Sequence, residues 1–259
     1  MSRLAVAALA SVIALAAAAC GGASGEPRLT IAAAADLRFA FEEIAAAFEE
    51  TCACDVALIF GSSGAFATQI KEGLPADVFA SADEAYVDEL DAAGLLLPDS
   101  KRVYAVGRIV LAVPAGSDLE PRSLHDLRDP SVRRIAIANP EHAPYGRAAK
   151  EALLSAGLWQ EIEPRLVLGE NASQATEFVE SGNAQAGVLP LSLAIRGEQR
   201  LRYALIDESL HRPLRQAAAV LERSEHAELA RGFIEFVAGP EGRPVMEKYG
   251  FELPGEERS

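Results

Sequence analysis

Residues Ile59–Ile70 read IFGSSGAFATQI, and this stretch shows how the chain is built. An apolar run ends at Gly61, two serines and Gly64 follow, and apolar residues then recur at helical spacing. The pattern predicts a strand and a helix joined by a short glycine-serine loop. Such a junction is either the elbow that exposes a nucleophilic serine, or a cradle in which backbone N–H groups and hydroxyls hold an anion.

Strand and helix patterns alternate along the chain in two series. Apolar runs predict the strands, and apolar residues three and four positions apart predict the helices. The expected strands are Leu29–Ala34, Asp55–Phe60, Asp77–Ala80, Arg108–Val113, Arg134–Ala138, Arg165–Leu168, Ala186–Leu189 and Ala217–Leu221. The expected helices are Leu37–Glu50, Ala65–Glu72, Glu84–Ala93, Arg147–Ala156, Ser173–Ser181 and Ala227–Val237. This alternation predicts parallel α/β sheets in two lobes.

The N-terminus has the pattern of a bacterial export signal. Arg3 precedes Leu4–Ala19, an unbroken run of apolar and small residues that is too short to span a bilayer comfortably. The run ends at Cys20, as in a lipoprotein signal, where this cysteine becomes the lipidated first residue of the mature chain. Cleavage as an ordinary secreted protein is the alternative. We predict a signal peptide over residues 1–19, a tether over residues 20–27, and an extracytoplasmic protein anchored to the membrane through lipid on Cys20.

Acidic residues dominate the charge of the chain. It has 38 Asp and Glu against 24 Lys and Arg, a formal net charge of −14. The predicted signal contains only Arg3 of these, so the mature chain is one unit more negative. Because a nucleic-acid-binding protein needs a basic face, the composition argues against that class. An anionic ligand would have to be captured by local groups, against a repulsion that salt screens.

Cys52 and Cys54 are the only cysteines of the sequence after Cys20. In an oxidising compartment they can form a tight local disulfide, and two free thiols are the alternative. Two thiols without a neighbouring His or Cys make a poor zinc site. The histidines show no metal-ligand spacing; they are His125, His142, His211 and His226.

Four junctions place small or hydroxyl-bearing residues before a predicted helix. They are AAAADL (32–37), FGSSGA (60–65), NPEHAPYG (139–146) and GENASQA (169–175). In open α/β sheets, ligands gather beyond the carboxyl ends of the strands, where free N–H groups and the helix dipole favour an anion. Ordinary helix capping explains any one junction better than a ligand does. Four together, two in each predicted lobe, favour a ligand held between the lobes.

The sequence argues against a serine hydrolase. GSSGA does not complete G-x-S-x-G, because Ala65 stands at the position of the last glycine. A serine nucleophile needs a base, and His142 is the only histidine close to one of the four junctions. No P-loop, dinucleotide-binding fingerprint or zinc motif occurs. We expect a binding protein and not an enzyme; an enzyme on the same fold that uses Ser63 or Asp36 is the alternative.

Several segments resemble the extracytoplasmic molybdate-binding proteins of ABC importers over nearly the whole mature chain. They are LTIAAAADL, FGSSG, GLPADVFASAD, NPEHAPYGRAAKEAL and FVAGPEGRPVMEKYGF. The resemblance implies an α/β, two-lobed type II periplasmic-binding-protein fold with the ligand cleft between the lobes. With the two strand–helix series, it predicts lobe I over residues 28–107 and 217–259, and lobe II over residues 108–216.

The same resemblance implies a ligand and partners. The ligand is molybdate, with tungstate as well, so molybdenum enters only as the bound oxyanion and no resident cofactor is expected. The partners are a membrane permease and an ATPase on other chains, and the binding protein itself is expected to be a monomer. A binding protein for another anion, such as sulfate or a phosphonate, is the alternative.

Carried over residue by residue, the resemblance gives five ligand-binding positions: Ala35, Asp36, Ser63, Tyr145 and the backbone N–H of Ala172. Position 36 carries Ser or Asn in the family and Asp here. Tyr145 matches a branch with a tyrosine hydroxyl donor. A ligand tyrosine of another branch falls on Pro190, which offers neither a hydroxyl nor an N–H group.

An ionised Asp36 that faced a dianion would repel it by several kcal/mol. We expect its side chain to turn outward as the N-cap of the helix from Leu37, which leaves its own N–H free for the ligand. Two alternatives are that Asp36 binds a proton together with the ligand, or that the ligand carries less negative charge or a cationic group.

Overall fold

A computed structural model describes residues 26–196 and 199–255 of the chain. The predicted signal peptide and Cys20 lie outside the described residues, as do residues 21–25 of the predicted tether and the last four residues. Within the described part, no helix is both long enough and apolar enough to cross a membrane.

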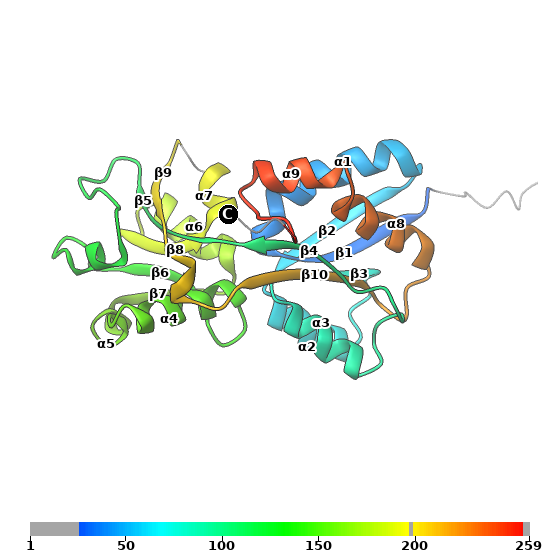
Figure 1. The fold of residues 1–259 in the computed structure, drawn as a ribbon, viewed down its shortest axis with the longest axis horizontal. Coiled ribbons are helices and arrows are strands. Elements are labelled where there is room, and N and C mark those ends of the chain that lie inside the picture. The colour runs from blue at the N-terminus through cyan, green and yellow to red at the C-terminus, as the bar shows by residue number, and fades with distance from the viewer. Residues whose placement is uncertain (1–25, 197–198, 256–259) are drawn as a thin grey trace, which may run out of the picture.

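Two five-stranded sheets form the centres of two lobes (Figure 1). The sheet of lobe I has the order β2-β1-β3-β10-β4, and that of lobe II has the order β7-β6-β8-β5-β9. The strands of lobe I are β1 (Arg28–Ala34), β2 (Asp55–Gly61), β3 (Val78–Ser81), β4 (Arg102–Gly107) and β10 (Leu214–Val220). The strands of lobe II are β5 (Ile109–Pro114), β6 (Ile135–Ala138), β7 (Leu166–Gly169), β8 (Ala186–Pro190) and β9 (Leu201–Leu205).

Helices cover both faces of the sheet of lobe I (Figure 1). On one face lie α1 (Arg38–Cys52), α8 (Ala227–Ala238) and α9 (Gly242–Lys248), and on the other lie α2 (Ser63–Glu72) and α3 (Glu84–Ala92). The helices of lobe II are α4 (Pro144–Ser155), α5 (Trp159–Ile162), α6 (Ala172–Glu180) and α7 (Leu191–Arg196). Short 3-10 turns are η1 (Ala35–Leu37), η2 (Leu124–Arg128), η3 (Glu163–Arg165) and η4 (Glu208–Leu210).

Side-chain alternation in β1 explains the two layers of helices. Leu29 and Ile31 point to the side where Phe41 of α1 and Phe233 of α8 pack edge to face. Ala32, which follows Ile31, belongs to the separate cluster under α2 and α3. Because successive side chains of a strand point to opposite faces, an apolar run without polar gaps is what a strand buried on both faces requires.

Both sheets are mixed, so the expectation of parallel sheets was wrong for several strands. β1 runs parallel to β2 and β3, but β10 is antiparallel to β3 and β4, and β5 is antiparallel to β8 and β9. The physical reason is the connection between the lobes. The chain leaves lobe I through β4 and continues directly into β5, and it returns from β9 into β10 (Figure 1).

The sheets change at Arg108, between β4 and β5, and in the connection between β9 and β10. The predicted lobe limits at residues 107/108 and 216/217 stay a prediction. Strands β4 and β9 were not expected, and β10 begins three residues before the expected Ala217. Arg108 itself is tied to the C-terminal segment, since its side chain donates to the carbonyl of Gly250 and lies 3.5 Å from the Glu252 carboxylate.

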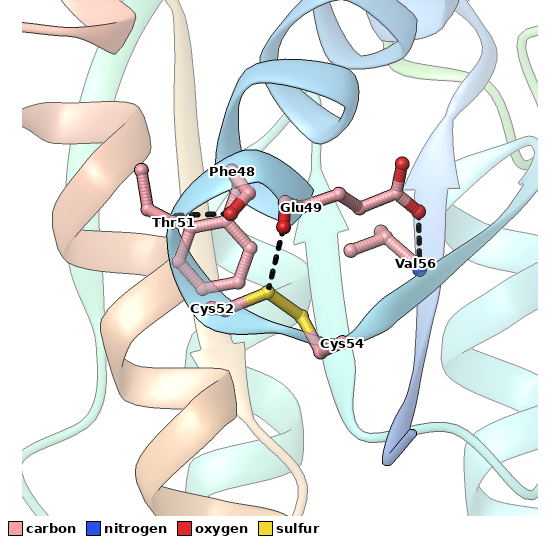
Figure 2. The surroundings of a disulfide bond; sticks show 6 residues. All are labelled: Phe48, Glu49, Thr51, Cys52, Cys54 and Val56. Carbon is pink, nitrogen blue, oxygen red and sulfur yellow. Dashed lines mark hydrogen bonds between the residues drawn. A yellow bond between two sulfur atoms is a disulfide. The ribbon is translucent and has the colours of Figure 1, made fainter. Parts of the chain in front are cut away.

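Cys52 and Cys54 form a disulfide at the end of α1 (Figure 2), which decides between the two alternatives left by the sequence. Ala53 between them has φ 50°, a left-handed conformation that ends the helix. Figure 2 also shows the Glu49 carboxylate accepting the N–H of Val56 at 2.7 Å. The turn from α1 into β2 is therefore fixed by a covalent bond and a hydrogen bond, far from the opposite end of β2 at Gly61.

Candidate functional site

A small cavity lies between the lobes, beyond the carboxyl ends of β1, β2 and β3. It is lined by Ala34, Ala35, Asp36, Gly61, Ser62, Ser63, Ala82, Ala143, Pro144, Tyr145 and Ala172. All five positions that the resemblance predicted are present in this lining, whereas Pro190 is not part of it. The centre of a water-sized sphere can move through only about 10 Å³ of this cavity, so the cavity is small. It has room for a ligand of very few atoms and none for a sugar or a peptide.

A larger groove, about 750 Å³ on the same measure, opens to solvent beside Phe39, Arg196 and Lys248. None of the predicted site residues lines it. Lys248 pairs with Glu43 and Arg200 pairs with Glu180, and Arg196 lies over the ring of Phe39. The cavity between the lobes is therefore the better candidate.

Helix N-termini from both lobes meet at this cavity. Ser63 begins α2, Pro144 and Tyr145 begin α4, Ala172 begins α6, and Ala35 begins the turn η1 that runs into α1. The first N–H groups of a helix have no partner inside the helix, and the dipole makes this end positive. Neutral donors and positive dipole ends directed at one small space favour an anion.

The two serines of GSSG have different roles. The hydroxyl of Ser62 caps α2 by accepting the N–H of Ala65 at 3.3 Å, and it lies 2.7 Å from Nδ1 of His142 in lobe II. Ser63 is fully buried, and its hydroxyl oxygen accepts the N–H of Ala82 at 3.0 Å. Since a hydroxyl that accepts in this way keeps its hydrogen, Ser63 can donate into the cavity.

Gly64 allows the lobes to touch next to the two serines. Its N–H donates to the carbonyl of His142 at 2.9 Å. A Cβ atom at this position would lie 2.6 Å from that carbonyl oxygen and 2.6 Å from the hydroxyl of Tyr86. A side chain here would push the lobes apart, so the second glycine of the segment serves the contact between them.

Asp36 does not cap a helix, contrary to the prediction. It lies within η1, and the N-cap position of α1 is Leu37, which makes no side-chain cap. Asp36 is only 2% exposed, and its carboxylate accepts from Nε2 of Gln216 at 2.6 Å. It is also hydrogen-bonded to Tyr145. Burial raises the pKa of Asp36 from 3.8 to about 6, although the bonds to Gln216 and Tyr145 lower it in part.

Gln216 is the residue that the sequence analysis missed. It is fully buried on β10, where the pairing with β4 shifts between Gln216 and Ala217. Its amide donates to Asp36 and, at 3.2 Å, to the hydroxyl oxygen of Tyr145, and it accepts from the hydroxyl of Tyr104 at 3.4 Å. The only signal in the sequence was one amide inside the otherwise apolar run QAAAV.

Tyr145 connects lobe II to this network. Its hydroxyl hydrogen is engaged with Asp36, and its oxygen accepts from Gln216. Burial and the charge of Asp36 raise the pKa of Tyr145 well above its usual value, so the phenol stays protonated. Gly107 makes room for this hydroxyl, since a Cβ atom there would lie 2.1 Å from it. The hydroxyl expected to donate to a ligand thus bonds to the protein in this structure.

More contacts between the lobes surround the cavity. The hydroxyl of Ser192 donates to the carbonyl of Asp36 at 2.8 Å, and that of Ser173 donates to the carbonyl of Ala35 at 3.3 Å. Together with the contacts of His142, they close the two lobes over the cavity. The structure is therefore a closed form of a two-lobed protein.

Comparison with known proteins agrees with this architecture. The family of bacterial extracellular solute-binding proteins matches residues 29–252. The chain belongs to this family. It is 36% identical over 231 residues to the molybdate-binding protein ModA of Rhodobacter capsulatus, covering 88% of this chain and 89% of the relative. It is 32% identical over 257 residues to ModA of Azotobacter vinelandii, covering 98% of each.

A solved structure shows the same fold. The periplasmic molybdate-binding protein of Azotobacter vinelandii superposes on this solute-binding protein with a TM-score of 0.82 and 30% sequence identity, over 87% of this chain and 99% of that chain. The two-lobed fold predicted from the sequence is confirmed. The expectation of an extracytoplasmic binding protein agrees with the description of the family.

Proposed function

We propose that this solute-binding protein captures molybdate, and tungstate as well, and delivers it to an ABC permease driven by an ATPase on other chains. The observation that carries the proposal is the meeting of four helix starts and the Ser63 hydroxyl at one closed cavity of very small volume. The names of its relatives, molybdate-binding proteins of Rhodobacter capsulatus and Azotobacter vinelandii, support the choice of ion.

The chemistry of the lining suits a tetrahedral dianion. Backbone N–H groups and one hydroxyl replace the hydration of the ion without a fixed positive charge, and no Lys, Arg or His side chain is among the lining residues of the described chain. The predicted donors are the N–H groups at Ala35, Asp36 and Ala172 and the hydroxyls of Ser63 and Tyr145. In this structure the Tyr145 hydroxyl bonds to Asp36 instead. Cavity size then separates molybdate and tungstate from the smaller sulfate.

We propose that the protein is a carrier and not an enzyme. Ser63 has no histidine beside it, because His142 is bonded to Ser62. A catalytic serine also needs a third group that orients its base. Among the described residues, no carboxylate is hydrogen-bonded to His142, and no cluster of three or more His, Cys, Asp and Glu could hold a metal ion.

We propose that the mature protein is a monomer held at the membrane by lipid on Cys20. The apolar run that ends at this cysteine supports the anchor. Replacing Cys20→Ser should release the protein into the soluble fraction of cells that express it. If wild type and variant partition alike, the anchor is excluded.

Titration calorimetry with molybdate, tungstate, sulfate, phosphate and a phosphonate tests the proposed ligand. We expect one molybdate or tungstate per chain, bound more tightly than sulfate by at least a factor of ten, about 1.4 kcal/mol. Tighter binding of sulfate or a phosphonate would favour the alternative ligand. Turnover of an ester or amide substrate by the same preparation would contradict the role of a carrier.

A further inference from the structure

A buried acidic residue, Asp36, lines the cavity that we propose for a dianion. Its carboxyl group is bonded to Tyr145, another lining residue. An ionised carboxylate close to a dianion in a site of low dielectric would cancel several hydrogen bonds. The site therefore needs either a positive charge beside Asp36 or a proton on it.

The described residues around Asp36 provide no positive charge. The carboxylate bonds to the amide of Gln216 on β10, to the hydroxyl of Tyr145 on α4 and to the backbone N–H of Asp36 itself, all of which are neutral. The titratable groups facing it are Tyr145 and, from β4, Tyr104, whose pKa values are raised well above their usual range by burial and by the charge of Asp36. Ser192 of α7 contacts only the Asp36 backbone carbonyl.

We propose that the site takes up its oxyanion together with one proton, which is held between the carboxyl group of Asp36 and the anion. This inference rests on the proposed function. No covalent bond to a heavy atom forms or breaks: solvent supplies the proton, one oxygen of Asp36 receives it and donates it in a hydrogen bond to the ligand. The other oxygen continues to accept from Nε2 of Gln216, as it does in this structure.

Burial brings the titration of Asp36 close to neutral pH, although the group is still mostly ionised there and its hydrogen bonds favour the charged form. Burial places its pKa at about 6 before any ligand is present, and a nearby dianion shifts the equilibrium further in the same direction. A proton can therefore be taken up from solution at neutral pH when the anion enters. Ser or Asn at this position, as in the resembling family, would bind the anion without such a step.

The proton also restricts the class of ligand. A hydrogen bond from a carboxylic acid is strongest to the oxygen of a basic anion, the conjugate base of a weak acid. Sulfate is the conjugate base of hydrogensulfate, a stronger acid than hydrogenmolybdate, so its oxygens accept less well. We expect the difference in binding affinity between molybdate and sulfate to depend on Asp36 as well as on cavity size.

Calorimetry of molybdate binding in two buffers with different ionisation enthalpies tests the inference, across about pH 6 to 9. For the wild type we expect uptake of about half a proton per anion near pH 6, where Asp36 is already half protonated, and of close to one proton above about pH 7. The affinity should fall by up to tenfold per pH unit above the carboxyl pKa. Asp36→Asn keeps the shape of the side chain and removes the charge, so proton uptake should vanish and affinity should be nearly independent of pH. Asp36→Ser is a second variant with the same expectation.

Asp77→Asn is the matched control. Asp77 is another buried carboxylate of lobe I, bonded to Thr30 and Ser224 away from the cavity, and this variant should keep the proton uptake of the wild type. Flat affinity and no proton uptake in the wild type would overturn the inference, as would unchanged proton uptake in Asp36→Asn and Asp36→Ser. If neither wild type nor these variants bind molybdate, tungstate, sulfate or phosphate at any pH, the proposed function itself fails, and the inference with it.

Discussion

Nη2 of Arg147 lies 2.6 Å from Oδ2 of Asp83, and this ion pair joins the first turn of α4 in lobe II to the start of α3 in lobe I. Both side chains are 30% exposed. Arg147 also donates to the hydroxyl of Tyr86 at 2.9 Å and lies over its ring. None of these three residues lines the cavity. They stabilise the closed form without contacting the proposed ligand.

Replacing Arg147→Met should weaken molybdate binding mainly by raising the dissociation rate. A ligand that binds the closed form loses the free energy that this contact adds to closure, about 1 kcal/mol, or roughly fivefold in affinity. Stopped-flow measurement of both rate constants checks this. Lys71→Met is the control, since Lys71 pairs with Glu89 inside lobe I. An equal loss in both variants would contradict a specific role of the Arg147 contact.

Replacing Ser63→Ala should weaken molybdate binding by about 1.5–3 kcal/mol, the range for a hydrogen bond to a charged group. Stability should fall as well, because the N–H of Ala82 loses its acceptor. Ser81→Ala is the matched control: Ser81 is equally buried, but its hydroxyl bonds only to the backbone of Asp83. Titration calorimetry of both variants is the measurement. Equal affinities in the two variants would exclude Ser63 as a donor.

Replacing Gly107→Ala should disturb the network of Asp36, Gln216 and Tyr145. The new Cβ atom would lie 2.1 Å from the hydroxyl oxygen of Tyr145 and 3.0 Å from the amide nitrogen of Gln216. Overpacking of this kind costs about 1–3 kcal/mol of unfolding free energy. Gly116→Ala, where no atom lies within 4 Å of the added Cβ, should leave stability nearly unchanged. Urea unfolding compares the two, and a stable Gly107→Ala protein would mean that Tyr145 moves freely.

The free energy of unfolding of the ligand-free protein should change with pH as Asp36 titrates. Its folded-state pKa of about 6 lies above the unfolded value of 3.8, so the folded protein binds this proton more tightly. The resulting stabilisation is complete below about pH 4 and is lost as the pH rises through 6. It amounts to about 3 kcal/mol, at 1.36 kcal/mol per pKa unit.

Other carboxylates change stability with pH in the opposite direction, so the wild type must be compared with Asp36→Asn. The pKa values of Glu43 and Glu151, for example, are lowered: Lys248 stabilises the charged form of Glu43, and bonds from Arg212 outweigh the burial of Glu151. They remove stability as the pH falls. As the pH rises from 4 to 7, we expect the free energy of unfolding of Asp36→Asn to increase relative to that of the wild type. Parallel curves for the two proteins would show that Asp36 titrates normally.

The sequence predicted the parts of the fold that local patterns determine. The strand at Ile31 and the helix at Phe41 and Phe48 follow from the spacing of apolar side chains, and the structure has both. The crossing strands β4 and β9 were not predicted, because their place in a sheet depends on partners far along the chain. The same holds for the mixed strand directions.

The sequence predicted which residues line the candidate site, but not how their side chains bond to one another. Loops before helix N-termini, with the family resemblance, brought Ala35, Ser63, Tyr145 and Ala172 to one cavity. The orientation of Asp36 was predicted wrongly, since the residue that holds its carboxylate, Gln216, is 180 positions away in the sequence. A contact between segments so distant leaves no periodic pattern, and one amide at the start of the run QAAAV was the only trace.

The proposed function requires one oxyanion to bind in the cavity between Ser63 and Ala172. Anomalous scattering at the molybdenum absorption edge, from crystals of the protein grown with molybdate, locates the ion directly. We expect a single strong peak per chain inside this cavity, with the hydroxyl of Ser63 and the N–H of Ala172 within hydrogen-bond distance of the ion's oxygens. A peak elsewhere, for example in the groove beside Arg196 and Lys248, or no peak in the cavity, would contradict the proposed binding site.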